Sequence, residues 1–171
     1  DIPGFQDRFK AVYKAIGPAV KVIWKNADAL VANSEGLRDF ALKFYDKKTI
    51  EVICNGVDTE CFYPDYSKRD SSKLNLLFVS RLIERKGLQH IIPQLKEIQK
   101  ATEKKVQLTI VGDGPYRETL EALTKECDVE EMVRFEGQKN KDELLLYYQA
   151  GDIFVFPSKR EGMPNVVLEA M

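Results

Sequence analysis

The sequence is poor in histidine and cysteine, the side chains on which much enzyme chemistry depends. It has one histidine, His90, and three cysteines, Cys54, Cys61 and Cys127, among 171 residues. A serine hydrolase needs a histidine as its base, and His90 falls within a predicted helix, so this class is not expected. The cysteines are too few and too widely spaced for a disulfide framework or a zinc site, and no metal ion is expected. We therefore place the chain in a reducing compartment.

The sequence also lacks a strong net charge and a long apolar run. The 26 basic and 27 acidic side chains leave a formal net charge of −1, so no overall field favours nucleic acid as a partner. No signal peptide and no apolar run that could span a bilayer is visible, which predicts a cytoplasmic location. The first residue is Asp1, and no C-cap glycine follows the last residue, Met171. We therefore expect that both ends were cut from a longer chain.

One predicted helix, residues 5–27, carries apolar residues at the helical period and four lysines on another face. These lysines are Lys10, Lys14, Lys21 and Lys25. Such a helix could lie on the anionic inner face of a membrane as a peripheral contact, or it could pack against a core with its lysines solvated, which the pattern favours. Gly17-Pro18 is expected to kink or split it.

The rest of the chain alternates between short apolar runs and helical patterns. Before a segment of linker composition at 63–73, we expect a strand at 29–32, a helix at 35–44 capped by Ser34, and a strand at 50–54. After it we expect strands at 74–80, 106–111, 133–135 and 153–156 and helices at 87–100, 115–125 and 140–150, with Pro115 as the first residue of its helix. Asn140 and Glu143 resemble a capping box. Apolar strands that alternate with helices predict an α/β fold with a parallel sheet covered on both faces.

Polar and glycine residues follow the predicted strands, at the edge of the sheet where such folds bind ligands. Arg81 ends the first strand after the linker, and Lys86 follows five residues later; together they suit a pyrophosphate, although loop cations are usually only solvated. Gly112 and Gly114 allow either a close approach to a ligand or a plain turn. The third glycine of a dinucleotide fingerprint is missing, and so is the Gly-Lys-Ser/Thr of a P-loop.

Two carboxylates, Glu161 and Glu169, flank the start of the last predicted helix, residues 165–171. The free N–H groups at a helix start attract anions, and a carboxylate accepts hydrogen bonds from hydroxyls. The arrangement suits a ligand that has a phosphate between two polyols. Lys159 and Arg160 precede the first glutamate; they either attract the ligand or are solvated, and we favour the second interpretation.

Several runs of the sequence resemble a known family when they are taken in order. They are 79–82 (VSRL) with Lys86-Gly87, 108–115 (LTIVGDGP), 133–137 (VRFEG), Pro157-Ser158, and 161–171 (EGMPNVVLEAM). In this order and spacing they resemble the retaining glycosyltransferases of family 4 (group 1), which have the GT-B fold. Earlier runs, 27–34 and 53–64, are similar to the family's passage from its first to its second domain.

The resemblance implies a role for each matching residue. Arg81 and Lys86 would neutralise the diphosphate of a nucleotide-sugar donor, Glu161 would face the donor sugar, and Glu169 would hold the ribose hydroxyls. The remaining donor contacts would come from Gly112 at the floor, from Gln138 and Lys139 at the base, and from the backbone of Gly162, Met163, Pro164, Asn165 and Val166.

The resemblance also implies an organisation and an activity. Residues 1–62 would be the end of the acceptor-side domain, and residues 74–171 a truncated, Rossmann-like donor domain. The whole protein would transfer a hexose from a nucleoside diphosphate to a glycan or lipid with retention of configuration, whereas the 171-residue piece would be inactive. Two alternatives stay open: a non-catalytic remnant that binds nucleotide-sugars, and a related GT-B epimerase.

Overall fold

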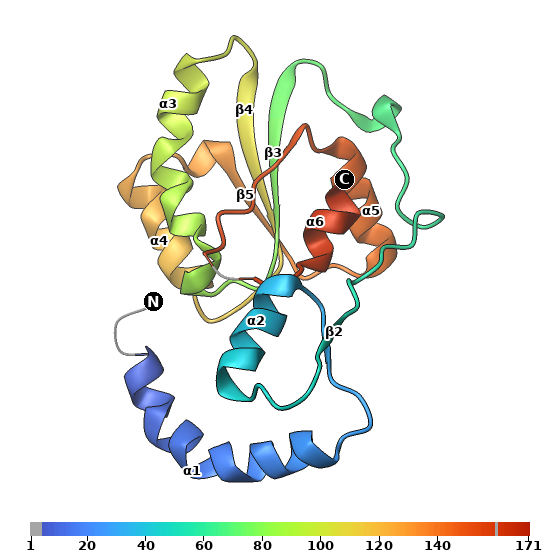
Figure 1. Cartoon of the computed structure of the whole chain (residues 1–171). Helices are drawn as coiled ribbons and strands as arrows, with labels where there is room; N and C mark the ends of the chain where they lie inside the picture. Colours follow the sequence, from blue (N-terminus) through green and yellow to red (C-terminus); the bar gives the residue numbers. More distant parts are fainter. Residues whose placement is uncertain (1–4, 160) are drawn as a thin grey trace. The chain divides into compact units, whose positions relative to one another are not determined.

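The computed structural model describes the backbone of residues 5–159 and 161–171, and side chains from residue 15 onward within these ranges (Figure 1). The chain forms two compact units, Asp1–Asn55 and Gly56–Met171. The segment 63–73, expected as a linker, belongs to the second unit and contains a short 3-10 turn, η1 (Tyr66–Lys68). The assignment of the two parts to an acceptor side and a donor side stays a prediction.

The first unit contains two helices and one short parallel strand pair. Helix α1 (Phe5–Asn26) runs through Pro18 without splitting, and Figure 1 shows that its axis bends along the way. Helix α2 (Glu35–Phe44) has the predicted bounds, and its start is fixed by the Ser34 side chain, which accepts a hydrogen bond from the Leu37 N–H. Strands β1 (Val31–Ala32) and β2 (Glu51–Val52) pair in parallel and are shorter than predicted.

Among the described side chains of the first unit, from residue 15 onward, many apolar ones are in contact with solvent. Val22, Ile23 and Phe40 keep 60%, 64% and 69% of their surface exposed. In the part of the chain that the structure describes, no helix is long and apolar enough to cross a membrane. The peripheral membrane contact of α1 stays a prediction.

The second unit is built on a four-stranded parallel sheet of order β5-β4-β3-β6. Its strands are β3 (Lys73–Val79), β4 (Lys105–Val111), β5 (Val133–Gly137) and β6 (Ile153–Phe154). The first two pair over seven residues, from Lys73 opposite Lys105 to Val79 opposite Val111. The predicted parallel α/β fold is therefore present, although β6 ends two residues early.

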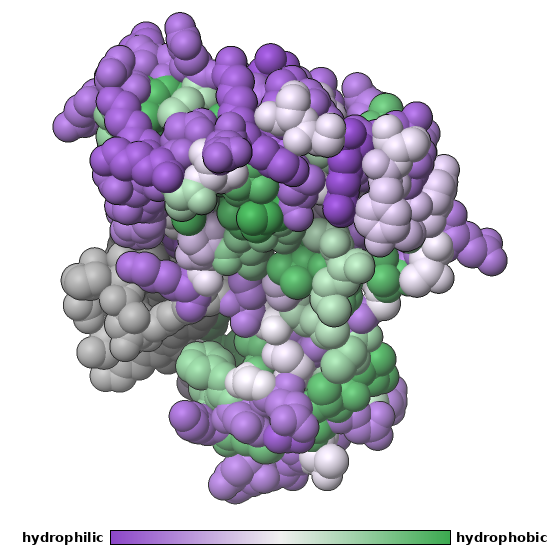
Figure 2. All heavy atoms as spheres, turned by 90° about the horizontal axis from the view of Figure 1, so that it is seen from above, coloured by the Kyte–Doolittle hydropathy of each residue, from purple (hydrophilic) through white to green (hydrophobic). Residues whose placement is uncertain are grey.

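Helices cover both faces of this sheet, so the second unit has two apolar layers. One layer packs strand residues such as Phe78 and Ile110 against α3 (Leu95–Lys100) and α4 (Arg117–Glu126). The other packs Leu77, Val79 and Val111 against side chains of α5 (Lys141–Ala150) and α6 (Asn165–Ala170). In the face of the molecule that Figure 2 shows, hydrophilic side chains surround an area of apolar side chains near the middle of the view.

Two predicted helix starts are wrong, and proline and glycine explain the first. Only 95–100 of the predicted helix 87–100 is α-helical; before it the chain makes the 3-10 turns η2 (Glu84–Lys86), η3 (Leu88–His90) and η4 (Ile92–Gln94). Gly87 has a left-handed φ of 79°, and Pro93 has no N–H for an α-helical bond. Helix α4 starts at Arg117 rather than at Pro115, because its first α-helical bond runs from the Leu120 N–H to the Tyr116 carbonyl at 3.1 Å, whereas the Arg117 N–H makes a 3-10 type bond to the Gly114 carbonyl.

Helix α5 begins as predicted. The Asn140 side chain accepts from the Glu143 N–H at 2.9 Å, and the Glu143 carboxylate accepts from the Asn140 N–H at 3.0 Å. This reciprocal capping box fixes the helix start by local hydrogen bonds. A 3-10 turn, η5 (Glu130–Met132), leads into β5.

Candidate functional site

A cavity of about 350 Å³ lies at the carboxyl ends of β3, β4 and β5. Its lining residues are Val79, Ser80, Arg81, Val111, Gly112, Asp113, Gln138, Lys139 and Leu144. Four residues predicted from the sequence as donor contacts, Arg81, Gly112, Gln138 and Lys139, thus meet in one cavity. They come together because parallel strands end at the same edge of the sheet.

Hydrogen bonds hold the strand ends of this cavity side by side. The N–H of Gly112 bonds to the carbonyl of Gly137 at 2.8 Å, and the N–H of Ser80 bonds to the carbonyl of Val111 at 3.1 Å. Gly112 has a φ of 127°, and a Cβ there would lie 2.0 Å from the Ser80 carbonyl oxygen. Only glycine fits this position, because both the dihedral and the approach of the Ser80 backbone exclude a side chain.

Two cationic residues and one acidic residue line the cavity, and the acidic residue forms an ion pair. The Arg81 side chain is exposed, and the Nζ of Lys139 lies 5.8 Å from the centre of the Tyr147 ring. Asp113 pairs with Arg117 at 3.3 Å, and Arg117 also bonds to Glu121 at 2.8 Å. The cavity lining therefore carries two cations, Arg81 and Lys139, and one carboxylate, Asp113, which shares Arg117 with Glu121.

Lys86 and Glu161, which the resemblance assigned to the diphosphate and to the sugar of the donor, are directly bonded to each other. The Nζ of Lys86 donates to Oε1 of Glu161 at 2.7 Å, and the Oγ of Ser158 donates to the same oxygen at 2.6 Å. Burial by itself raises the pKa of Glu161, but the hydrogen bonds from Lys86 and Ser158 outweigh it and hold that pKa below its usual value. Glu161 is therefore an ionised carboxylate, and its cation is already in place.

Backbone packing brings these two residues together from distant parts of the chain. A Cβ on Gly87 would lie 2.4 Å from the Pro157 carbonyl oxygen, so the loop after β3 packs tightly against the segment after β6. The Nζ of Lys86 also lies 5.3 Å from the centre of the Phe156 ring. Lys159 is exposed, and Arg160 lies outside the described residues.

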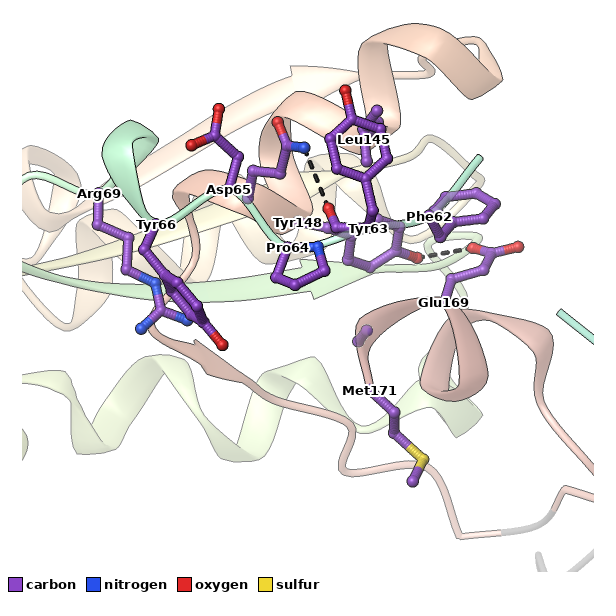
Figure 3. A pocket seen from close by; sticks show the side chains of 12 residues that line it. Phe62, Tyr63, Pro64, Asp65, Tyr66, Arg69, Leu145, Tyr148, Glu169 and Met171 are labelled. Carbon is purple, nitrogen blue, oxygen red and sulfur yellow. Dashed lines mark hydrogen bonds between the residues drawn. The ribbon is translucent and has the colours of Figure 1, made fainter. Parts of the chain in front are cut away.

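Glu169 lies at a second cavity, of about 130 Å³, rather than among the lining residues of the first (Figure 3). The hydroxyl of Tyr148 on α5 donates to its Oε2 at 2.8 Å. Burial, followed by this bond, raises the pKa of Tyr148 far above its usual value. The Gln149 side chain donates to the Tyr63 carbonyl at 3.1 Å, which ties the segment 62–69 to α5 beside Glu169.

The predicted backbone contacts form the turn before α6 and its first residues. Gly162 and Met163 lie in a bend, Pro164 is the N-cap residue, and Asn165 and Val166 begin the helix. The N-cap, Pro164, makes no side-chain hydrogen bond to the helix, and the Val167 N–H bonds to the Pro164 carbonyl at 3.1 Å. The roles of these residues toward a ligand stay predictions.

The sequence interpretation missed two contributors to this site, Tyr148 and Ser158. Tyr148 lies inside a predicted helix, and the signal that could have found it is that a buried tyrosine usually has a partner for its hydroxyl. Ser158 lies three residues before Glu161, and this spacing could have suggested the bond. His90, outside the site, is exposed at the end of η3. Among the described residues, no group of three His, Cys, Asp or Glu side chains could hold a metal ion. That the protein works without a metal stays a prediction.

Comparison with known proteins identifies the family. The family model for glycosyl transferases group 1 matches residues 62–171. A GDP-mannose-dependent alpha-(1-6)-phosphatidylinositol monomannoside mannosyltransferase of Mycobacterium tuberculosis is 33% identical over 146 residues, which are 77% of this chain and 38% of the relative. The alpha-monoglucosyldiacylglycerol synthase of Streptococcus pneumoniae is 28% identical over 158 residues, which are 85% of this chain and 36% of the relative.

Solved structures show the same fold. The sucrose-phosphate synthase of Thermosynechococcus elongatus matches with a TM-score of 0.77 at 25% identity, over 92% of this chain and 41% of the other. The structural neighbours are GT-B glycosyltransferases, so the expected fold is confirmed. The chain spans about two fifths of the length of the first relatives that it matches. On the match over residues 62–171, the chain belongs to the glycosyl transferases of group 1.

Proposed function

We propose that the whole protein transfers a hexose from a nucleoside-diphosphate sugar to a glycan or lipid acceptor, and that residues 56–171 bind the donor. The observation that carries this proposal is the cavity at the carboxyl ends of β3, β4 and β5, which brings Arg81, Gly112, Gln138 and Lys139 together in a chain of this family. The relatives support it, because the mycobacterial enzyme is named for GDP-mannose as its donor.

The donor's diphosphate is assigned to Arg81, which lines the cavity, and to Lys86, which is not one of its lining residues. Arg81 offers a planar fork of donors, and the ammonium of Lys86 has three hydrogens, of which Glu161 takes one at 2.7 Å. When the bond to the sugar breaks, negative charge grows on the departing diphosphate, and cations placed near it bind the transition state more tightly than the ground state. Gln138 and Lys139 would then contact the base.

Glu161 is assigned to the sugar and Glu169 to the ribose. In each carboxylate one oxygen already accepts hydrogen bonds from the protein. For Glu161 the donors are Lys86 and Ser158, and for Glu169 the donor is Tyr148. Their remaining acceptor sites suit the hydroxyls of a polyol. We further propose that the sugar keeps its configuration and that the departing diphosphate takes the acceptor's proton, so that no protein nucleophile is needed.

A lipid acceptor is favoured by the names of two relatives. The mycobacterial relative is named for a phosphatidylinositol monomannoside and the pneumococcal relative for a glucosyldiacylglycerol. The chain of 171 residues covers only part of such enzymes, so we expect it to bind a donor nucleotide without transferring the sugar.

Isothermal titration of the chain with UDP and with GDP tests the proposal. We expect one of them to bind, and we expect Arg81→Ala to weaken that binding by roughly ten- to a hundredfold, because a hydrogen bond to a charged group is worth about 1.5–3 kcal/mol. Arg134→Ala is the matched control, since Arg134 is an exposed arginine of β5 that does not line the cavity. The assignment would be contradicted if neither nucleotide bound, or if the two variants lost the same affinity.

A further inference from the structure

One hydrogen bond joins the helix that carries Glu169 to its neighbour. The Tyr148 hydroxyl on α5 donates to Oε2 of Glu169 on α6 at 2.8 Å, across 21 residues of sequence. Figure 3 shows the second oxygen of the Glu169 carboxylate pointing away from Tyr148. The bond therefore fixes the side chain while leaving the other oxygen outside it.

Helix α6 needs such a contact, because it is too short to hold a side chain in place by itself. It has six residues, and its N-cap, Pro164, makes no side-chain hydrogen bond. Helices of this length are not stable in water without tertiary packing. Val166 packs against Leu77, Val79 and Val111 of the sheet, and Tyr148 then fixes the residue one turn further along.

The Tyr148 ring is itself held from two sides, so its hydroxyl has a defined position. Its centre lies 5.8 Å from that of Phe62, edge to face, and 6.0 Å from that of Phe154 at a tilt of 50°. Burial and the bond to Glu169 raise the pKa of Tyr148. At neutral pH the hydroxyl therefore keeps its proton and acts as a donor.

We propose that Tyr148 is a positioning residue, which holds one oxygen of Glu169 so that the other accepts the ribose hydroxyls of the donor. This inference rests on the donor site proposed above and adds a residue to it. Tyr148 itself would not touch the donor. Its effect would be confined to the part of the ligand that Glu169 recognises, the ribose.

The test measures discrimination for ribose rather than affinity alone. UDP, GDP and their 2′,3′-dideoxy counterparts are titrated into the wild-type chain and into Tyr148→Phe, which removes one oxygen and keeps the ring. We expect the wild type to prefer the ribose form and Tyr148→Phe to lose about tenfold of this preference, since the bond it removes involves a charged group. Affinity for the dideoxy form should stay the same.

Tyr147→Phe is the matched control. It also removes a tyrosine-to-glutamate bond from α5, since the Tyr147 hydroxyl donates to Glu136 at 2.9 Å, but it leaves Glu169 untouched. We expect its preference for ribose to equal that of the wild type. A second variant, Glu169→Asp, shortens the side chain by one methylene, keeps the charge and should lose the same preference as Tyr148→Phe.

The possible results distinguish a failure of the proposed donor site from a failure of the role of Tyr148. Absence of any nucleotide binding by the wild type overturns the donor site and the role of Tyr148 together. Ribose preference that persists in Tyr148→Phe overturns only the role of Tyr148. If Tyr148→Phe does not fold, Glu169→Asp decides: ribose preference that persists there overturns the assignment of Glu169 to the ribose and the role of Tyr148 with it. A loss of affinity for ribose and dideoxy forms alike, with preference unchanged, shows a structural role and also overturns it.

Discussion

Lys86 and Glu161 form a partly buried ion pair whose strength can be measured by mutation. Their Nζ and Oε1 atoms lie 2.7 Å apart, and the two side chains keep 13% and 22% of their surface exposed. A hydrogen bond between charged groups contributes about 1.5–3 kcal/mol, whereas a fully exposed pair contributes less than about 1 kcal/mol. Since solvent still reaches both side chains, we expect a coupling free energy of about 1.5 kcal/mol.

The assay is a double-mutant cycle of Lys86→Met and Glu161→Gln, read as free energies of unfolding in urea at pH 7. The pair of Lys96 and Asp128 is the control, because its atoms are 3.0 Å apart but its side chains are 51% and 91% exposed. We expect the control cycle to give much the smaller coupling. Equal couplings in the two cycles would refute the argument that burial strengthens the pair.

The same pair makes stability depend on pH in a defined direction. The pKa of Glu161 is lower in the folded chain than its usual value of 4.5. A carboxylate with a lowered pKa stabilises the fold at pH values above its unfolded pKa, and this contribution is lost as the pH falls through the folded value. Coupling in the Lys86–Glu161 cycle should therefore persist from pH 7 to 5 and decrease in more acidic solution. A coupling that grows on acidification would contradict this sign.

Two further predictions concern backbone geometry. Gly112→Ala should destabilise the chain by about 3 kcal/mol or more, because it combines a strained φ with a contact of 2.0 Å to the Ser80 carbonyl oxygen. The control is Gly36→Ala, whose added Cβ meets nothing within 4 Å and should not destabilise the chain. Equal free energies of unfolding of the two variants in urea would refute this. Asn140→Ala should lower the free energy of unfolding by about 1 kcal/mol, because it removes the N-cap of α5, whereas Asn140→Asp should keep most of that stability. Thermal unfolding measures both variants, and similar losses of stability in the two would mean that the cap contributes little.

Local patterns predicted those elements whose ends are fixed by nearby residues. The apolar runs predicted β3 and β4 to within a residue or two, because a strand buried on both faces is a nearly continuous apolar run. The starts of α2 and α5 followed from Ser34 and Asn140, which accept hydrogen bonds from the backbone three residues on. The predicted helix before β4 is too long, because Gly87 and Pro93 interrupt the α-helical hydrogen bonding that the apolar period suggested.

The sequence by itself determined which residues follow the strands, and therefore that Arg81, Gly112, Gln138 and Lys139 would meet at one edge of a parallel sheet. Only the tertiary structure decided that Lys86 bonds to Glu161, 75 residues away, and that Glu169 bonds to Tyr148. The physical reason is the order of the sheet. Because β6 lies next to β3, the loops that follow these two strands come into contact. Strand order depends on packing of the whole unit, which no local pattern contains.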